Sequence, residues 1–427
     1  MTKHPIVPGP AAARAGASAR DSVVVVAANN AASYLGLALM ALVTSRYLGS
    51  EGRGVVVLFT TTESFCLLVA ACGVNTVARV RLVAATDRLA MADFLGFAVV
   101  LAIVDMALCA SVGTLVLDAS GALVTPLVMP LLVALSGVHL AGYFVRDALA
   151  AFGHNNAATR ADVIYASTQL VALLIVQVLA GLTVNAVLVI VVAATAVQLS
   201  YLLITLRAQR LIAWPRFAWT AWWRHLRLSW PALGLTFGQA GAFKLDRLVL
   251  GLLTTPAAVG IYSVAATVGD LVSLVPLSIA QVTFSTVARD DNRSRLLRLK
   301  RLNIAVTMIV VVVFLLAAPS IVHTVFGPAF ADAVTPLLIL LVAGIPTAIY
   351  HVNITAVTAS GRIGAAAQAP AVGLIVCLLL DLLLIPPFGI VGAACASLVT
   401  YTGMAVHARL LTAGPSRRWD AERGMGR

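Results

Sequence analysis

The chain is dominated by apolar stretches long enough to cross a bilayer, which follow one another from end to end and are separated by short polar segments. A helix needs about 20 predominantly apolar residues to span the hydrocarbon core, where only helices and closed barrels satisfy every backbone polar group. With 61% hydrophobic and 11% charged residues, no long polar segment is left for a soluble domain. The sequence therefore predicts an all-α polytopic membrane protein.

Helix-breaking and polar residues between the apolar stretches give twelve predicted helices. We expect them at about 22–48, 54–78, 93–117, 122–145, 161–181, 185–206, 229–253, 257–286, 303–326, 333–359, 365–386 and 388–411. Cytoplasmic loops carry an excess of Lys and Arg. With both termini cytoplasmic, all but four of the 29 Lys and Arg fall on the cytoplasmic side. This pattern supports twelve spans and accounts for the net charge of +12 without a nucleic-acid partner.

The segment 207–228 differs from the other loops, because it holds four of the six tryptophans among five arginines. Amphipathic rings beside basic residues predict an interfacial helix on the inner leaflet. It divides the chain into an N-lobe of six helices, 22–206, and a C-lobe of six helices, 229–411. The flanking residues 1–21 are predicted to be a disordered cytoplasmic tail, and residues 412–427 a second cytoplasmic tail.

Two sequence repeats support this division. LAAFGHNNAATRA follows the fourth helix of the N-lobe, and VTASGRIGAAAQA follows the fourth helix of the C-lobe 208 residues later, with five identical positions. Gly54 with Glu63 has a counterpart in Gly260 with Asp270, each pair in the second helix of its lobe. An offset of six helices preserves orientation, so we expect the lobes to be related by an axis along the membrane normal.

The predicted seventh helix carries three charges, Lys244, Asp246 and Arg247. Each costs roughly 2.5–3.5 kcal/mol at the bilayer centre on insertion scales. Lys244 lies roughly 22 Å along the helix from Ser229, in its outer half, and shares a face with Arg247 because residues three apart are neighbours. The arrangement predicts a water-filled cavity that receives an anionic head group. The alternative is an internal ion pair that locks this helix to a neighbour, with Asp246 paired to a basic residue.

Further charges lie near the outer ends of the first two helices and inside the second helix of each lobe. Intramembrane carboxylates commonly serve a proton, ion or ion-pair role. We predict four cations that bind anionic substrate groups: Lys244, Arg247, Arg46 and Arg53. We predict three carboxylates for ion coupling or counter-charge: Asp246, Glu63 and Asp270. Ordinary loop-end charges and structural ion pairs remain the alternative for these groups.

The sequence lacks the common motifs of disulfide frameworks, metal sites and catalytic sites. The five cysteines all fall inside apolar stretches without a CxxC pair, which argues against a disulfide framework or a zinc site. HExxH, GxSxG and Walker A patterns are missing. We therefore predict a protein that is not an enzyme and needs no cofactor or metal, driven by a gradient, the membrane potential or consumption of its substrate.

Three motifs resemble those of one family. The stretch LSWPALGLTFGQAGAFKLDRLVLGLLTTPAAVGIYSVAATVGDL resembles the seventh and eighth helices of Wzx-type polysaccharide flippases. LLIPPFGIVGAACASLVTY resembles their closing turn, and SRYLGSEGRGVV their first outer loop. The matching residues of the long stretch are Ser229, Pro231, Asp246, Gly251, Gly260, Tyr262 and Ala265. Asp381 stands where an Asn is more usual. The chain is identified as a member of this O-antigen and exopolysaccharide family, whose superfamily also holds multidrug antiporters and lipid II flippases.

The resemblance implies a flippase fold of two six-helix lobes that turns a polyprenyl pyrophosphate-linked oligosaccharide from the inner to the outer leaflet by alternating access. It implies the cytoplasmic membrane of a bacterium, a monomer, and glycan polymerases and glycosyltransferases as candidate partners. Two alternatives remain open: a cation-coupled multidrug antiporter of the same superfamily, and a transport-inactive membrane scaffold of a glycan-synthesis complex.

Overall fold

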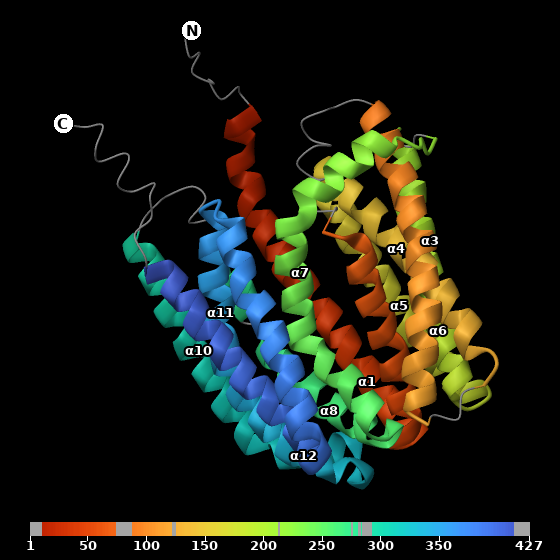
Figure 1. The fold of residues 1–427 in the computed structure, drawn as a ribbon, viewed down its shortest axis with the longest axis vertical. Helices are drawn as coiled ribbons and strands as arrows, with labels where there is room; N and C mark the ends of the chain where they lie inside the picture. The colour runs from red at the N-terminus through yellow and green to blue at the C-terminus, as the bar shows by residue number, and fades with distance from the viewer. Residues whose placement is uncertain are drawn as a thin grey trace.

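The computed structural model describes residues 11–73, 88–121, 125–211, 214–274, 276–280, 283 and 293–413, and its regular structure in these ranges is helical (Figure 1). The helices are α1 (Ala11–Ala71), α3 (Arg88–Ala119), α4 (Val128–Ala151), α5 (Asn155–Leu179), α6 (Val184–Ala208), α7 (Trp219–Leu253), α8 (Pro256–Val272), α10 (Arg293–Ser320), α11 (Val334–Ala359) and α12 (Ile363–Ala413). A π-helical turn, Ile321–Phe326, and a 3-10 turn, Pro328–Ala333, join α10 to α11. Within the described ranges, eight helices are long and apolar enough to cross a membrane, so the chain is a multi-pass membrane protein.

Helix α1 is a helical hairpin with its break at Gly49, between the first two predicted helices. The backbone φ there is 68°, in the left-handed region that glycine enters without a steric penalty. The two arms fold back on each other, since Arg53 Nη1 donates a hydrogen bond of 2.9 Å to Thr44 Oγ1 across the turn. We call the arm before Gly49 the descending arm and the arm after it the returning arm.

Helix α12 is a second hairpin and holds the last two predicted helices. Its break is at Gly389, with a φ of 55°, two residues after Pro387 in the pair Pro386 and Pro387. Proline removes a backbone donor and the glycine takes a backbone conformation closed to most residues, so this sequence ends one arm and starts the next. The arms then pack closely: a Cβ on Gly373 would stand 2.5 Å from the sulfur of Met404.

Some predicted boundaries are wrong. Residues 11–21, predicted as part of a disordered tail, form the first turns of α1, because this alanine-rich segment has high helix propensity. The predicted helix 257–286 is interrupted, because α8 ends at Val272 and a turn follows at Ser273. Residues 1–10 and 414–427 of the predicted tails lie outside the described residues, as do residues 74–78 of the second predicted helix.

The predicted interfacial connector has no separate helix, because α7 already begins at Trp219 and continues into the membrane. Its only strongly buried tryptophan among the described residues of the segment is Trp222, which stacks on Phe97 at 5.3 Å between ring centroids. Trp222 Nε1 also donates to the Asp93 carbonyl at 3.1 Å. Trp214 is 92% exposed and Trp219 72% exposed. The start of α7 is thus held on α3, with aromatic rings left for the interface.

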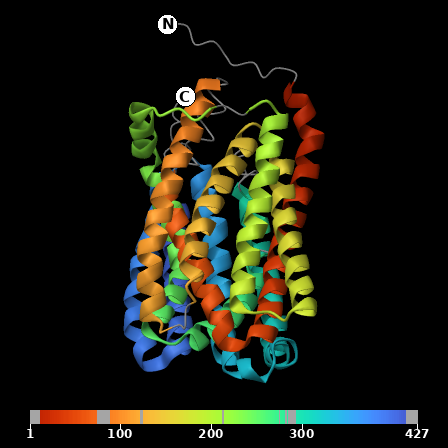
Figure 2. The ribbon, with the colours of Figure 1, turned by 90° about the vertical axis from the view of Figure 1, so that its right-hand side faces the viewer.

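The helices form two groups that meet along α1, α7 and α8 (Figures 1 and 2). Separate apolar clusters fill the N-terminal group of α1 and α3–α6. A larger cluster fills the C-terminal group and takes in Val57 and Leu58 from the returning arm of α1. The described start of α1 and the end of α12 lie toward the same end of the molecule (Figure 1), and the hairpin turns at Gly49 and Gly389 toward the other.

The repeated sequences form matching turns. Gly153 and Gly361 follow the ends of α4 and α11 with φ values of 84° and 81°. In the first turn the His154 N–H donates to the Leu149 carbonyl, and in the second the N–H of Arg362 donates to the carbonyl of Val357 208 residues on. This is the hydrogen bond that closes a helix end over a left-handed glycine. The weak sequence repeat therefore corresponds to an equivalent structural turn in each half.

The two halves touch through a reciprocal glycine crossing between the returning arm of α1 and α8. A Cβ on Gly54 would stand 1.7 Å from the Pro256 carbonyl oxygen, and a Cβ on Gly260 1.9 Å from the carbonyl oxygen of Ser50. Gly260 follows Gly54 by the same number of residues as Pro256 follows Ser50, so the contact is nearly symmetric. Because either Cβ would overlap backbone, this approach requires glycine on both sides.

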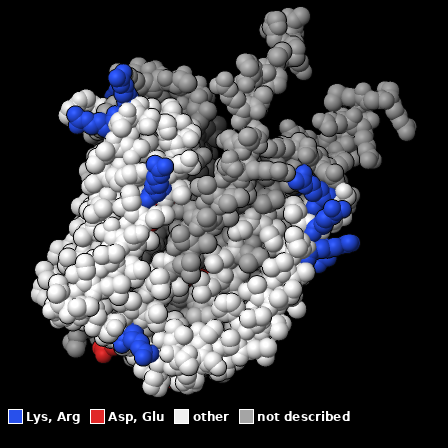
Figure 3. Space-filling model, turned by 180° about the vertical axis from the view of Figure 1, so that it is seen from behind, with Lys and Arg blue, Asp and Glu red and all other residues white. Residues whose placement is uncertain are grey.

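The outward surface of the helices is apolar. Leu115, Val178 and Leu316 are 68%, 83% and 81% exposed, as expected where lipid replaces water. Figure 3 shows one such face, on which most of the visible Lys and Arg side chains lie in the upper half, toward the end at which α1 begins.

Candidate functional site

A cavity of about 730 Å³ lies between the two helix groups. Side chains from α1, α4, α5, α6, α7, α8 and α11 line it, and the lining includes charged and amide groups that are unusual inside a membrane protein. Five of the seven predicted site residues reach it: Arg53, Glu63, Lys244, Arg247 and Asp270. The glycine crossing lies beside Arg53 and limits the cavity toward the hairpin turns.

Lys244 is the most available cation of the cavity. Its side chain is exposed and lines the cavity, and it makes no hydrogen bond or ion pair with any residue that the structure describes. It interacts electrostatically with Arg247 and with the carboxylates of Asp270 and Glu63. An ammonium group offers three donors. Lys244 can therefore give a full set of hydrogen bonds to an anion without breaking one within the described protein.

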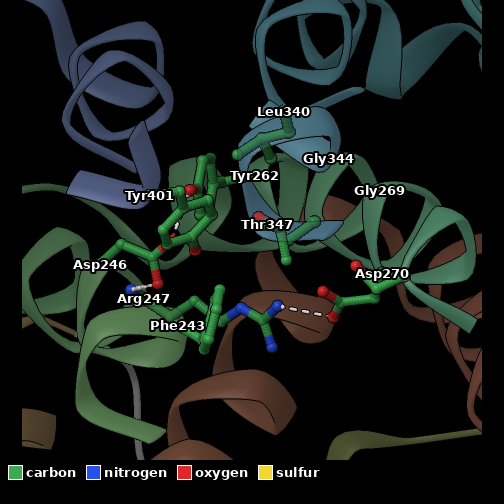
Figure 4. A pocket seen from close by; sticks show the side chains of 12 residues that line it. Phe243, Asp246, Arg247, Tyr262, Gly269, Asp270, Leu340, Gly344, Thr347 and Tyr401 are labelled. Carbon is green, nitrogen blue, oxygen red and sulfur yellow. Dashed lines mark hydrogen bonds and ion pairs between the residues drawn. The ribbon is translucent and has the colours of Figure 1, made fainter. Parts of the chain in front are cut away.

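Arg247 shares the face of Lys244, as residue spacing predicts, but it is partly engaged. Its Nη2 lies 3.2 Å from Asp270 Oδ2, and the side chains are 15% and 56% exposed. Its Nε is buried and has no hydrogen-bond partner among the described residues. Figure 4 shows this pair pointing across the space between α7 and α8. An incoming anion would compete with Asp270 for the guanidinium.

Arg53 joins the two halves next to the glycine crossing. It is buried, at 7% exposure. Its Nη1 bonds to Thr44 on the descending arm of α1, and its Nε donates to Ser263 Oγ on α8 at 3.2 Å. Both partners are neutral hydroxyls, so the guanidinium keeps its positive charge unbalanced by a direct carboxylate contact among the described residues. Arg53 thus combines a contact between the lobes with a positive charge at the closed end of the cavity.

Asp246 faces away from the cavity and binds the C-terminal helices together. The 3%-exposed carboxylate accepts hydrogen bonds from the Tyr262 hydroxyl on α8 and, at 3.4 Å, from Ser397 Oγ on α12. It also accepts the backbone N–H of Arg247 at 2.8 Å. Figure 4 shows it directed toward Tyr262 and Tyr401 rather than toward the guanidinium. Asp270, not Asp246, is therefore the direct partner of Arg247.

Glu63 has a partner that the sequence did not indicate. Its Oε1 lies 2.7 Å from Nδ1 of His139 on α4, and the carboxylate is 3% exposed while the imidazole is 41% exposed. This pair links the returning arm of α1 to α4 at mid-cavity. His139 was missed because a single histidine in an apolar stretch carries no spacing signal; only the fold brings it to Glu63.

Arg46 lies apart from the other predicted cations. It is exposed, and its Nη1 reaches the Val325 carbonyl at 3.4 Å, in the π-helical turn after α10. The structure therefore does not bring Arg46 to the cavity. It lies near the hairpin turn of α1 at Gly49, with its side chain exposed.

A second polar group lines the cavity on the N-terminal side and was also missed. Arg146 on α4 pairs with Asp162 on α5, with 2.6 Å between Nη2 and Oδ2. Gln198 Nε2 on α6 donates to the other carboxylate oxygen at 3.2 Å. The predicted helix 122–145 ends just before Arg146, whereas α4 continues to Ala151.

The comparison with protein families gives one match over most of the chain. The model of a family described as polysaccharide biosynthesis protein matches residues 43–335. Among curated proteins, the probable flippase AglR of Haloferax volcanii is 24% identical over 204 residues, covering 45% of this chain and 39% of AglR. The probable low-salt glycan biosynthesis flippase Agl15 of the same organism is 26% identical over 176 residues, or 39% of this chain and 37% of Agl15. The chain thus matches about two fifths of the length of these relatives.

Solved structures share the fold over nearly the whole chain. The lipid II flippase MurJ in an inward closed conformation has a TM-score of 0.75 at 12% identity, covering 92% of this chain and 87% of MurJ. A multidrug resistance MATE family transporter of the MOP superfamily has a TM-score of 0.67 in its inward-facing conformation, at 16% identity and with 90% and 96% covered. In an outward-facing conformation the score is 0.61, at 16% identity and with 91% and 95% covered. At these identities the likeness shows the fold alone.

Proposed function

Because the chain belongs to the polysaccharide biosynthesis protein family, we propose that it is a flippase that moves a polyprenyl pyrophosphate-linked oligosaccharide from the inner to the outer leaflet. The observation that carries this proposal is the interlobe cavity, where Lys244 has no hydrogen-bond or ion-pair partner among the described residues and Arg247 and Arg53 line the same wall. A pyrophosphate is a multiply charged anion, and guanidinium and ammonium groups are its usual ligands. The flippase names of the curated relatives agree with this substrate class.

We propose that twelve segments cross the membrane, with both termini cytoplasmic. The crossings are the two arms of α1, the two arms of α12, and α3–α8, α10 and α11 between them. The cavity then faces the cytoplasm, and the glycine crossing closes the outer side. Transport would require the crossing to separate while the opposite ends of the lobes approach each other, which is alternating access by rocking of two repeats.

The alternative of a cation-coupled drug antiporter is less well supported by the cavity. Such a protein would be expected to offer unpaired carboxylates to a cation. Here Glu63 is bound to His139 and Asp270 to Arg247, while Lys244 is without a partner in the described residues. A transport-inactive scaffold has no use for a buried charged cavity, since intramembrane charges destabilise the inserted helix. We place the protein in the cytoplasmic membrane of its cell. Because the curated relatives are archaeal, this proposal is not restricted to bacteria.

The double variant Lys244→Gln with Arg247→Gln tests the proposal. Liposomes containing the unaltered protein should expose lipid-linked saccharide on the far leaflet, as measured by its accessibility to an added membrane-impermeant oxidant of sugar diols. The double variant should expose it at no more than the rate of protein-free liposomes, while reaching the bilayer in equal amount. Unchanged exposure in the variant would show that these cations do not serve translocation. Drug efflux by the unaltered protein without saccharide exposure would favour the antiporter.

A further inference from the structure

The cavity has two chemically different walls. The cationic wall consists of Arg53, Lys244 and Arg247 from α1 and α7. The N-lobe wall consists of cavity-lining side chains from α4, α5 and α6: Tyr143, Arg146, Asp162, Tyr165 and Gln198. The proposed function uses the first wall for the pyrophosphate and leaves the second without a role.

The N-lobe wall is polar but electrically balanced. Arg146 and Asp162 neutralise each other across 2.6 Å, and Gln198 holds the second oxygen of Asp162 at 3.2 Å. The pair is partly open, with side chains 35% and 21% exposed. A wall with one positive and one negative charge in contact has little attraction for a free anion, in contrast to the cationic wall. It instead presents donors and acceptors held in fixed positions.

The side chains of this wall suit a polyhydroxylated neutral molecule. A guanidinium has five N–H donors, and the ion pair with Asp162 uses only one side of the Arg146 fork. The Gln198 carbonyl oxygen remains an acceptor when its amide nitrogen donates. Tyr143 and Tyr165 add half-buried rings with an apolar face and a polar edge. A pyranose ring has the complementary surface, with apolar C–H faces and hydroxyl groups around its edge.

The two walls are also separated along the cavity. On α4, His139 reaches Glu63 at the level of the electrostatic contacts of Lys244. Arg146 follows His139 by seven residues, or about 10 Å along the helix axis toward its end. A substrate with a charged end and a glycan end could therefore contact both walls at once.

We propose that the N-lobe wall is the saccharide subsite, where Arg146, Asp162 and Gln198 bind the sugar hydroxyl groups of the lipid-linked glycan. This inference rests on the proposed function, because it assumes a substrate in which sugar and pyrophosphate are joined. It assigns recognition of the glycan to the N-lobe and recognition of the pyrophosphate to the cationic wall. Substitutions on the two walls should therefore have separable effects.

The test compares two lipids bound to the purified full chain, by native mass spectrometry. One probe is the pool of lipid-linked saccharides extracted from membranes of the source organism, and the other is polyprenyl pyrophosphate without sugar. Gln198→Ala and Asp162→Asn should weaken binding of the glycan-bearing lipid by about 3- to 10-fold, as for the loss of one or two hydrogen bonds. Binding of the bare lipid should stay within twofold. Gln368→Ala, on the exposed face of α12, is the matched control and should change neither.

The outcomes distinguish the subsite from the function. Lys244→Gln should weaken both lipids, because both carry the pyrophosphate. If the N-lobe variants weaken both lipids equally, or neither, the saccharide subsite is wrong while the flippase proposal stands. If the unaltered protein binds neither lipid, the proposed function fails and the subsite with it. Should Asp162→Asn lower the unfolding temperature, Gln198→Ala carries the comparison, since it leaves the Arg146–Asp162 pair in place.

Discussion

Replacement of Lys244 by Gln should be the single substitution that most weakens binding of a pyrophosphate lipid. Glutamine keeps much of the side-chain length and polarity while it removes the charge. Lys244 makes no hydrogen bond or ion pair with any described residue, so the free protein loses neither kind of contact and its stability should hold. Any loss of affinity then reports the interaction with the ligand.

The magnitude follows from the state of each cation in the free protein. A hydrogen bond to a charged group contributes about 1.5–3 kcal/mol, so its loss from Lys244 should raise Kd about 10- to 150-fold. Arg247 is already paired with Asp270 at 3.2 Å, and its ligand contact must replace that pair. Arg247→Gln should therefore raise Kd by only about 3- to 10-fold, because the contact with the ligand is partly offset by the lost contact with Asp270. The order of the two effects is the sharper prediction.

Titration of the detergent-solubilised protein with sugar-free polyprenyl pyrophosphate, followed by thermophoresis, gives the Kd values. Lys300→Gln is the matched control: it removes the same charge on α10, where the ammonium bonds to Thr412 and does not line the cavity. Its Kd should stay within twofold of the unaltered protein. A smaller effect for Lys244→Gln than for Arg247→Gln would refute the argument that internal pairing sets the available affinity.

Three further perturbations follow from the contacts described. Gly54→Ala should hold the lobes apart at the glycine crossing, because its Cβ would meet a backbone oxygen at 1.7 Å. Spin-label distances across the crossing should lengthen, whereas Gly403→Ala, whose Cβ meets nothing within 4 Å, should leave them unchanged. Tyr262→Phe removes a donor from the buried Asp246 and should destabilise the fold by about 1.5–3 kcal/mol, seen as a lower unfolding temperature; an unchanged temperature would mean that water or another group replaces the hydroxyl. Asp270→Asn frees the paired arginine and should tighten pyrophosphate binding severalfold in the same titration, and weaker binding would show that the carboxylate itself contacts the ligand.

Most of the helical architecture could be predicted from the sequence, because the bilayer sets the length of the apolar segments and the distribution of Lys and Arg between the loops. The breaks between adjacent helices were placed well where Gly49 and Gly389 mark them. The start of α1 was missed since an alanine-rich segment resembles a flexible tail in composition but favours a helix in conformation. The end of α8 at Val272 has no strong signal, as the apolar character continues beyond it.

The candidate site could be predicted only in part from the sequence. The spacing of residues along one helix shows which side chains share a face, but not which side chains of other helices they contact. Lys244 and Arg247 share a face by their spacing alone. That Arg247 pairs with Asp270, and that Asp246 binds Tyr262, depends on how α7 and α8 pack. The contact of His139 with Glu63 could not be predicted for the same reason, since it depends on how α1 and α4 pack. Arg46 and Arg53 are alike in sequence, yet the hairpin turn between them leaves Arg46 exposed and brings Arg53 to the cavity.

The reciprocal glycine crossing has a consequence for membrane energetics. A protein that admits a large glycan must open widely, and any gap left on the opposite side would let protons and ions leak down their gradients. A contact made by side chains can loosen gradually and admit water as the side chains rearrange. At this crossing, carbonyl oxygens pack directly against the glycine Cα atoms, so no side chain is present to fill a partly opened gap. Contact at this crossing is therefore either complete or lost. In the proposed flippase such a seal would be either closed or open, which would let a wide substrate path coexist with an energised membrane.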